Sequence, residues 1–139
     1  MSAARVFVDT NVFTYVFDDA EAEKQARAVE VLEGEKREIF VSTQVLQELY
    51  VSLTKGRHPI ATPEIAERAV REVTDYSIIQ VDQQLVFAAI DTSRRNQLSF
   101  WDALIVRAAA QAGCEILLSE DLNDGQVIEG VRVENPFRN

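Results

Sequence analysis

Residues 5–11 read Arg5-Val6-Phe7-Val8-Asp9-Thr10-Asn11, a short apolar and β-branched run that stops abruptly at three polar residues. Such a run is typical of a strand that is covered on both faces. Thr10 and Asn11 are residue types that cap helices, so we expect a helix to begin directly after the strand with one of the two as its N-cap. The sequence therefore predicts a buried strand whose carboxyl end carries Asp9.

The same alternation of strand and helix continues along the chain. The further expected strands are residues 39–41, 77–81, 115–119 and 131–133. The further expected helices are residues 21–33, Ser42 or Thr43 to about Leu53, a helix opening at Thr62-Pro63, Asp82 to about Arg95, and Ser99 to Gly113. Strands that alternate with helices pair in parallel through right-handed crossovers, with helices on both faces of the sheet. The predicted class is α/β.

Length and composition indicate the number of domains and the cellular location to expect. At 139 residues and 15.6 kDa we expect a single domain over residues 1–139. The lone Cys114 can form neither an internal disulfide nor a cysteine-rich zinc site. The start of the chain lacks the apolar stretch of a signal peptide, and no run reaches the roughly 18 apolar residues of a membrane span. These features predict a cytoplasmic protein without membrane association.

The net charge is the first puzzle. Twenty-three acidic against 14 basic residues give −9, whereas a nucleic-acid-binding protein usually has a basic face. Binding of a nucleic acid would therefore depend on local arginines and on cations held by acidic residues. The alternative is that the acidic surface only aids solubility.

Several kinds of active site are excluded by residue counts. The one histidine, His58, cannot supply a histidine-pair ribonuclease or a histidine-rich zinc site. The five glycines match neither a P-loop nor a dinucleotide-binding motif, and no nucleophile-elbow motif is present. Carboxylates are what remains.

Four carboxylates stand out by position. Asp9 and Asp121 follow the first and fourth strands, where α/β sheets bind ligands at the reversal of strand order. Glu48 lies on the flank of the apolar stripe of its helix, from which it can reach that edge. The alternatives are ordinary turn residues for the two aspartates and a solvated helix glutamate for Glu48.

Asp102 is the only acid in residues 99–114, a helix that is apolar on nearly every side and is expected to be mostly buried. A carboxylate in such a helix needs a partner, because an unpaired buried charge costs several kcal/mol. Ser99 and Asp102 also form a capping-box pattern, which is compatible with metal binding because both place Asp102 at the open end of the helix.

Four carboxylates without a lysine or histidine among them would repel one another and raise each other's pKa. Mg²⁺ or Mn²⁺ resolves this conflict, since both are hard cations that prefer oxygen ligands. Such ions can activate a water and neutralise charge on a phosphodiester, so hydrolysis needs no histidine.

Four stretches, in this order, resemble the PIN-domain nucleases, and within them the VapC-like toxins of bacterial and archaeal toxin–antitoxin pairs. They are residues 6–12, 44–49, 100–105 and 117–125. The resemblance implies a three-layer α/β/α sandwich with a mainly parallel five-stranded sheet in the order 3-2-1-4-5. It also implies that the acids Asp9, Glu48, Asp102 and Asp121 are the catalytic quartet that binds Mg²⁺ or Mn²⁺, with Thr10, Asn11 and Ser119 as supporting residues and Asp124 as a possible further acid.

The function implied by the resemblance is metal-dependent endonucleolytic cleavage of RNA by the toxin of a toxin–antitoxin system. A homodimer and a cognate antitoxin protein are implied as well. Four basic residues are candidates for contacting RNA phosphates, with ordinary surface charge as the alternative: Lys55, Arg57, Arg94 and Arg95.

Two other functions stay open. The first is a PIN-like binding module that has lost catalysis and acts through its partner. The second is an α/β phosphotransfer domain, which needs a lysine beyond a late strand, whereas the lysines of this chain are at positions 24, 36 and 55.

Overall fold

Strand β1 (Arg5–Val8) lies inside a sheet of six strands in the order β3-β2-β1-β4-β6-β5. The structure is a computed structural model that describes residues 4–138. The remaining elements are α1 (Thr10–Val16), α2 (Ala22–Gly34), β2 (Glu38–Ser42), α3 (Thr43–Thr54), α4 (Pro63–Val73), β3 (Ser77–Ile79), α5 (Gln83–Asn96), α6 (Phe100–Gln111), β4 (Ile116–Leu118), β5 (Val127–Ile128) and β6 (Val131–Glu134). The predicted strand order is confirmed, because the fifth expected strand is β6.

The sheet is parallel apart from its last strand. β1 pairs in parallel with β2 and β4, so that Phe7 lies opposite Phe40 on one side and Leu117 on the other. β5 is antiparallel to β6 and was not expected from the sequence. Its two residues are too few to show a periodic pattern, and its existence depends on the turn at Glu129 and Gly130. Both have positive φ, 52° and 77°, as a two-residue type I′ hairpin requires.

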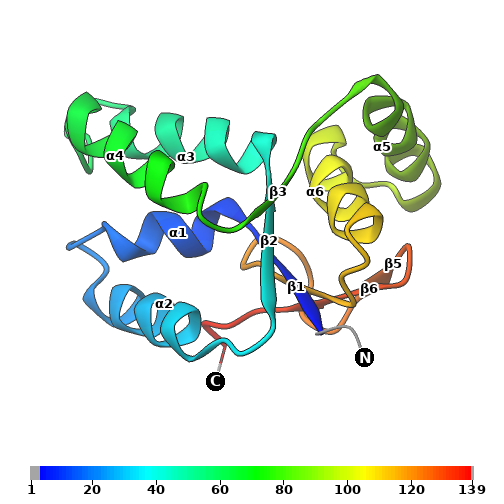
Figure 1. The fold of residues 1–139 in the computed structure, drawn as a ribbon, viewed down its shortest axis with the longest axis horizontal. Helices are drawn as coiled ribbons and strands as arrows, with labels where there is room; N and C mark the ends of the chain where they lie inside the picture. The colour runs from blue at the N-terminus through cyan, green and yellow to red at the C-terminus, as the bar shows by residue number, and fades with distance from the viewer. Residues whose placement is uncertain (1–3, 139) are drawn as a thin grey trace.

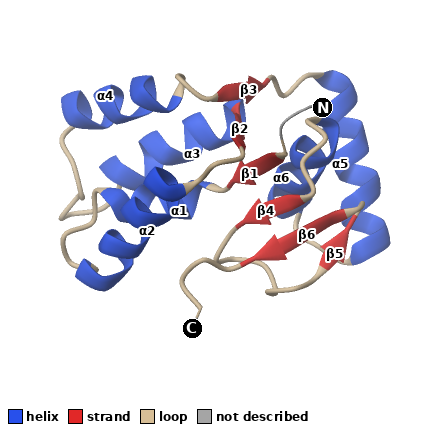
Figure 2. Cartoon of the chain, turned by 60° about the horizontal axis from the view of Figure 1, so that its bottom comes forward, coloured by secondary structure: helices blue, strands red, loops and turns tan. Residues whose placement is uncertain are grey.

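Helices cover both faces of the sheet, as expected for right-handed crossovers. Figures 1 and 2 show α1 to α4 together on one side of the strands and α5 and α6 on the other. The predicted three-layer α/β/α arrangement is thereby confirmed. Among residues 4–138, no helix is both long and apolar enough to cross a membrane.

The central strands are apolar because they are enclosed by both helical layers. Phe7, Val8 and Leu117 of β1 and β4 are almost completely buried, as are Val45 and Leu49 on the inner side of α3. This burial fixes the register of β1 against β4, and with it the relative position of the polar residues that follow the two strands.

Element boundaries differ from the expectation at several places, including the start of α1 and the ends of β3 and β4. The N-cap of α1 is Asp9 rather than Thr10 or Asn11, because Asp9 has an extended backbone and its side chain accepts a hydrogen bond from the Thr10 N–H. β4 is one residue shorter than expected at each end. β3 ends at Ile79 rather than Val81, since the Val81 N–H donates to Thr43 Oγ1 at 3.0 Å instead of to a neighbouring strand.

Replacing the central aromatic side chain tests this arrangement. Phe7→Ala is expected to lower the free energy of unfolding by about 3–5 kcal/mol, since it removes a fully buried ring and leaves a cavity. Urea denaturation would measure the loss. The matched control is Phe87→Ala, which removes a ring that is 60% exposed. An equal loss in both variants would contradict the central place of β1.

Candidate active site

The loops at the carboxyl ends of β1 and β4 border a cleft of about 740 Å³. Helix α3 and the first turn of α6 complete its walls, and Asp9, Glu48 and Asp121 are among the residues that line it. Three of the four predicted carboxylates therefore face one space, although they are separated by up to 112 positions in the sequence.

Asp9 is the most enclosed of these acids, with 5% of its surface exposed. Its Oδ1 accepts a hydrogen bond from the Thr10 N–H at 2.7 Å. Its Oδ2 accepts one from Ser119 Oγ at 2.8 Å and a longer one from Asn11 Nδ2 at 3.4 Å. All three donors are electrically neutral, so the carboxyl group is held in place without being neutralised.

The pKa of Asp9 is raised to about 7, and burial is the main cause. The hydrogen bonds from Ser119 and Thr10 lower the pKa in part, while the negative charges of Asp121 and Glu48 raise it further. Asp9 is thus a carboxyl group that titrates near neutral pH. A divalent cation in the cleft would favour its ionised form.

Glu48 is fixed by hydrogen bonds to both of its carboxylate oxygens. Thr10 Oγ1 donates to Oε1 at 2.8 Å, and Gln44 Nε2 donates to Oε2 at 3.1 Å. Thr10 therefore joins Asp9, through its backbone, to Glu48, through its hydroxyl group. The supporting role expected for Thr10 stays a prediction, and these two contacts are compatible with it.

Asn11 and Ser119 connect Asp9 to Asp121. Asn11 Nδ2 lies 3.4 Å from Asp9 Oδ2 and 3.1 Å from Asp121 Oδ2, so one amide group bridges two carboxylates. Ser119 Oγ donates to Asp9 and accepts from the Asp121 N–H at 3.1 Å. Both side chains are placed to orient the acids.

Asp102 lies in the first turn of α6, and its N–H donates to Ser99 Oγ at 3.1 Å, as the capping pattern predicts. Burial raises the pKa of Asp102, a hydrogen bond with Ser99 lowers it, and the charge of Asp121 raises it. The expectation that the helix is mostly buried is confirmed from Ala103 onward, but its first turn is an exception. Asp102 is half-buried and the neighbouring Trp101 is 61% exposed, because burial of the helix begins only at Ala103.

The four acids do not converge into a closed ligand cage. Within residues 4–138, no three Asp, Glu, His or Cys side chains form a group that could hold a metal ion as they stand. Neutral groups of Thr10 and Asn11 lie between the carboxylates. The donor set nevertheless fits a hard cation, because it consists of oxygen atoms and Asp9 lacks a compensating positive charge among its hydrogen-bond donors.

Gln44 is a site residue that sequence reasoning missed. Its Nε2 donates to Glu48 Oε2 and to the backbone oxygen of Trp101, both at 3.1 Å, and so links α3 to the first turn of α6. The side chain is 3% exposed, and its Oε1 is buried without a hydrogen-bond partner. Its position four residues before Glu48 on the same helix was the only available signal.

A second missed feature is an ion pair beside the acids. Lys24 Nζ from α2 lies 2.6 Å from Glu120 Oε2, and Tyr15 Oη donates to Glu120 Oε1 at 2.5 Å. Burial alone would raise the pKa of Glu120, but hydrogen bonds from Lys24 and Tyr15 lower it overall. The negative charge of Glu120 is therefore offset by Lys24. Asp121, the next residue, accepts a hydrogen bond from the neutral Asn11 instead.

Asp124 is not brought to the cleft. Its Oδ1 accepts from the Asn135 N–H at 2.8 Å, and its Oδ2 lies 4.0 Å from Arg138 Nη1. It borders a different pocket, together with residues of α2 and the segment after β6.

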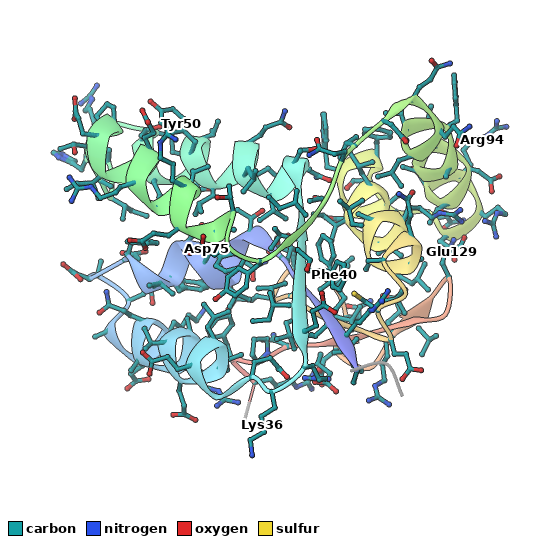
Figure 3. The ribbon with its side chains drawn as sticks, in the orientation of Figure 1. Lys36, Phe40, Tyr50, Asp75, Arg94 and Glu129 are labelled. Atoms are coloured by element: carbon teal, nitrogen blue, oxygen red, sulfur yellow. The ribbon has the colours of Figure 1, made fainter. Side chains whose placement is uncertain are left out.

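Of the candidate RNA-contacting residues, some lie at or near the cleft and others lie away from it on α5. Lys55 lines the cleft, and Arg57 is exposed in the loop that follows. Arg95 instead pairs with Asp91 at 2.9 Å and with Glu129 at 2.5 Å, at the turn that precedes β6. Figure 3 places Arg94 on the outer side of α5, so the structure does not bring this pair to the carboxylates.

Comparison with known protein families identifies a match to the PIN domain. The model of the PIN domain family matches residues 6–124. A toxin–antitoxin complex from Klebsiella pneumoniae is similar in structure, with 20% identity, a TM-score of 0.73, and coverage of 96% of this chain and 99% of that chain. The sarcin–ricin-loop-cleaving toxin VapC20 of Mycobacterium tuberculosis has 22% identity, a TM-score of 0.71, and coverage of 91% and 98%. DNA-bound VapBC from Salmonella typhimurium has 18% identity, a TM-score of 0.65, and coverage of 96% and 98%.

At these identities the structural similarity shows a shared fold. No curated protein matches the sequence.

The raised pKa of Asp9 makes stability depend on pH. Between about pH 4 and 7 the folded, metal-free protein keeps a proton that the unfolded chain has released, so the contribution of Asp9 to stability falls as the pH rises through this window. Asp9→Asn, which is neutral and still able to cap α1, is expected to raise the Tm at pH 8 and to have little effect near pH 4. The difference in unfolding free energy at pH 8 is on the order of a few kcal/mol.

Thermal unfolding in a chelator, at several pH values, would measure this difference. Asp91→Asn on the exposed side of α5 is the matched control, and its effect should not follow the same pH dependence. A wild-type protein as stable at pH 8 as the Asp9→Asn variant would contradict the raised pKa.

Proposed function

The chain belongs to the PIN domain family, and we propose that it is a metal-dependent endoribonuclease that acts as the toxin of a toxin–antitoxin pair. The observation that carries this proposal is the position of Asp9. It is buried at the carboxyl end of β1, beside Asp121 and Glu48 in the same cleft, and none of its hydrogen-bond donors is charged. Burial of a carboxyl group without a compensating positive charge costs stability, whereas such perturbed carboxyl groups are typical of cation-binding and catalytic sites.

We propose that Asp9, Glu48, Asp102 and Asp121 hold Mg²⁺ or Mn²⁺. When bound, such an ion activates a water and offsets the negative charge of the phosphodiester under attack. The chain itself positions the acids. Ser119 and the Thr10 N–H fix Asp9, while Thr10 Oγ1 and Gln44 fix Glu48. Cation binding at neutral pH would release the proton that Asp9 otherwise retains.

Lys55 is the cationic side chain, among the described residues that line the cleft, that can meet an RNA phosphate. Lys24 is not free for this purpose, because Glu120 and Tyr15 engage its ammonium group. Because Lys24 is engaged in this way, it is not available as the lysine that the phosphotransfer alternative requires.

RNA is proposed as the substrate and an antitoxin protein as the inhibitor, in a cytoplasmic homodimer. Two structures of similar fold support the proposed substrate and inhibitor. One is a toxin–antitoxin complex, and the other is a toxin that cleaves the sarcin–ricin loop. Exposed apolar side chains such as Tyr50, Ile65 and Val127 offer surface for protein contacts.

One observation favours a second candidate, a PIN-like module that binds its partner without catalysis. In the described part of the chain the acids do not close around a cation position without moving. Metal binding distinguishes the two, since a silent module has no need of it.

Removal of single acids tests the activity. Asp9→Asn and Asp102→Asn are each expected to lower metal-stimulated RNA cleavage by about 100-fold or more, because each deletes one charge from the proposed cation site. Cleavage of labelled RNA, resolved by gel, is the measurement. Asp91→Asn serves as the control, because Asp91 lies on α5 and is paired with Arg95. Full cleavage by both site variants would refute the assignment.

Addition of a metal tests the proposed cofactor. Mn²⁺ or Mg²⁺ at about 100 times its Kd should stabilise the wild-type protein by about 2.7 kcal/mol, and should stabilise Glu48→Gln much less. Calorimetric titration at pH 7 in two buffers of different ionisation enthalpy should also detect proton release, which Asp9→Asn abolishes. If no heat of binding is found for the wild type, the non-catalytic module is the correct function.

A further inference from the structure

Trp101, the single tryptophan of the chain, is exposed and lies close to the proposed metal-binding acids. Its side chain is 61% exposed, although most of the residues that follow it in α6 are buried. It lines the same cleft as Asp9 and Glu48. Phe100 contacts its ring edge-on, with 5.0 Å between the ring centroids and an interplanar angle of 78°. With 61% of its surface exposed, Trp101 remains accessible to a ligand despite this contact.

The backbone of Trp101 is held close to the carboxylates. Glu48 Oε2 and the Trp101 carbonyl oxygen both lie 3.1 Å from Gln44 Nε2, so the two oxygens are no more than about 6 Å apart. Asp102 is the next residue in the chain. The backbone of Trp101 is therefore adjacent to two of the four proposed acids, Glu48 and Asp102, rather than on a remote surface.

The charge of the protein explains why such a group is needed. RNA-binding proteins usually gain most of their affinity from phosphate contacts with Lys and Arg. This chain has a net charge of −9, and Lys55 is the cation among the described residues that line the cleft. Stacking of a base on an aromatic ring supplies affinity that does not depend on charge.

The surroundings of Trp101 fit a nucleotide better than a protein. The neighbouring lining residues on α3 and beyond are mostly polar and include Gln47, Ser52 and Lys55, with Val51 and Ile60 as apolar exceptions. Core positions of protein interfaces are depleted of charge, whereas a nucleotide presents an apolar face with polar edges and a phosphate.

We propose that Trp101 is a stacking platform for an unpaired RNA base next to the phosphodiester that is cleaved. The proposal rests on the ribonuclease function proposed above and narrows its substrate class to RNA with an accessible, unpaired base at the cut. A paired duplex cannot place a base on the indole without opening.

Fluorescence of the wild-type protein tests the contact directly, because Trp101 is its single tryptophan. In a chelator, so that no cleavage occurs, the four homo-oligoribonucleotides are titrated separately, with a fully paired RNA duplex of equal charge as the control. Quenching by single-stranded RNA, and much weaker quenching by the duplex, is expected. Equal quenching by both, or by neither, would overturn the proposal.

Cleavage kinetics test its contribution to binding. Trp101→Ala is expected to raise KM for single-stranded RNA about tenfold, which corresponds to about 1.4 kcal/mol and falls within the range for base–aromatic stacking. Trp101→Phe should retain most of the affinity, and kcat should change little in either variant. Phe87→Ala removes another exposed aromatic side chain, on α5, and should leave KM unchanged.

The outcomes separate the two proposals. If the wild type cleaves RNA but Trp101→Ala and Trp101→Phe have the same KM as the wild type, the stacking site is wrong and the ribonuclease function stands. If the wild type cleaves no RNA, the function fails, and the fluorescence titration alone decides the stacking site. If RNA leaves the fluorescence unchanged and Trp101→Ala alters the mass measured by light scattering, Trp101 is instead a contact between protein chains.

Discussion

The carboxyl group of Asp9, buried at the end of the strand around which the sheet is built, requires hydrogen-bond donors that only neighbouring segments can supply. One is the first N–H of α1, another is the hydroxyl of Ser119 after β4, and the third is the amide of Asn11. Because β1 and β4 pair in parallel and end at the same edge, these donors arrive together. The site is therefore a consequence of strand pairing, and it forms only when the sheet does.

The partly buried acids of this protein fall into two groups according to their partners. Glu120 and Glu129 are each hydrogen-bonded to a cationic side chain, and the pKa of each is lowered although burial acts in the opposite direction. For Asp9 and Asp102 burial prevails, and the pKa is raised. Among the described contacts, the Asp9 carboxyl group accepts hydrogen bonds from neutral groups, and the side chain of Asp102 interacts with the neutral Ser99. Cationic side chains thus offset the charges of Glu120 and Glu129, whereas Asp9 and Asp102 have neutral hydrogen-bond partners, as is typical of acids at functional sites.

The net charge of −9 is compatible with the proposed cleavage of RNA. Under that proposal, a basic surface would raise affinity for any nucleic acid, whereas an acidic surface would restrict productive contact to the cleft, where a divalent cation, Lys55 and the Trp101 ring would act together. Gln44 couples these features, since one side chain touches both Glu48 and the backbone of Trp101.

The sequence by itself determined the α/β class and singled out four acids as candidates, because hydrophobic periodicity, capping residues and positions after strands are local signals. The strand order followed from the resemblance to the PIN-domain nucleases. The sequence also correctly paired Ser99 with Asp102. Only the tertiary structure decided what each acid meets: Lys24 reaches Glu120 across 96 positions, Asp124 turns to Asn135, Asp9 caps α1, and Trp101 stays exposed on an otherwise buried helix. These outcomes depend on how the crossovers place distant side chains, and no pattern within one segment encodes a contact whose other half lies about a hundred residues away.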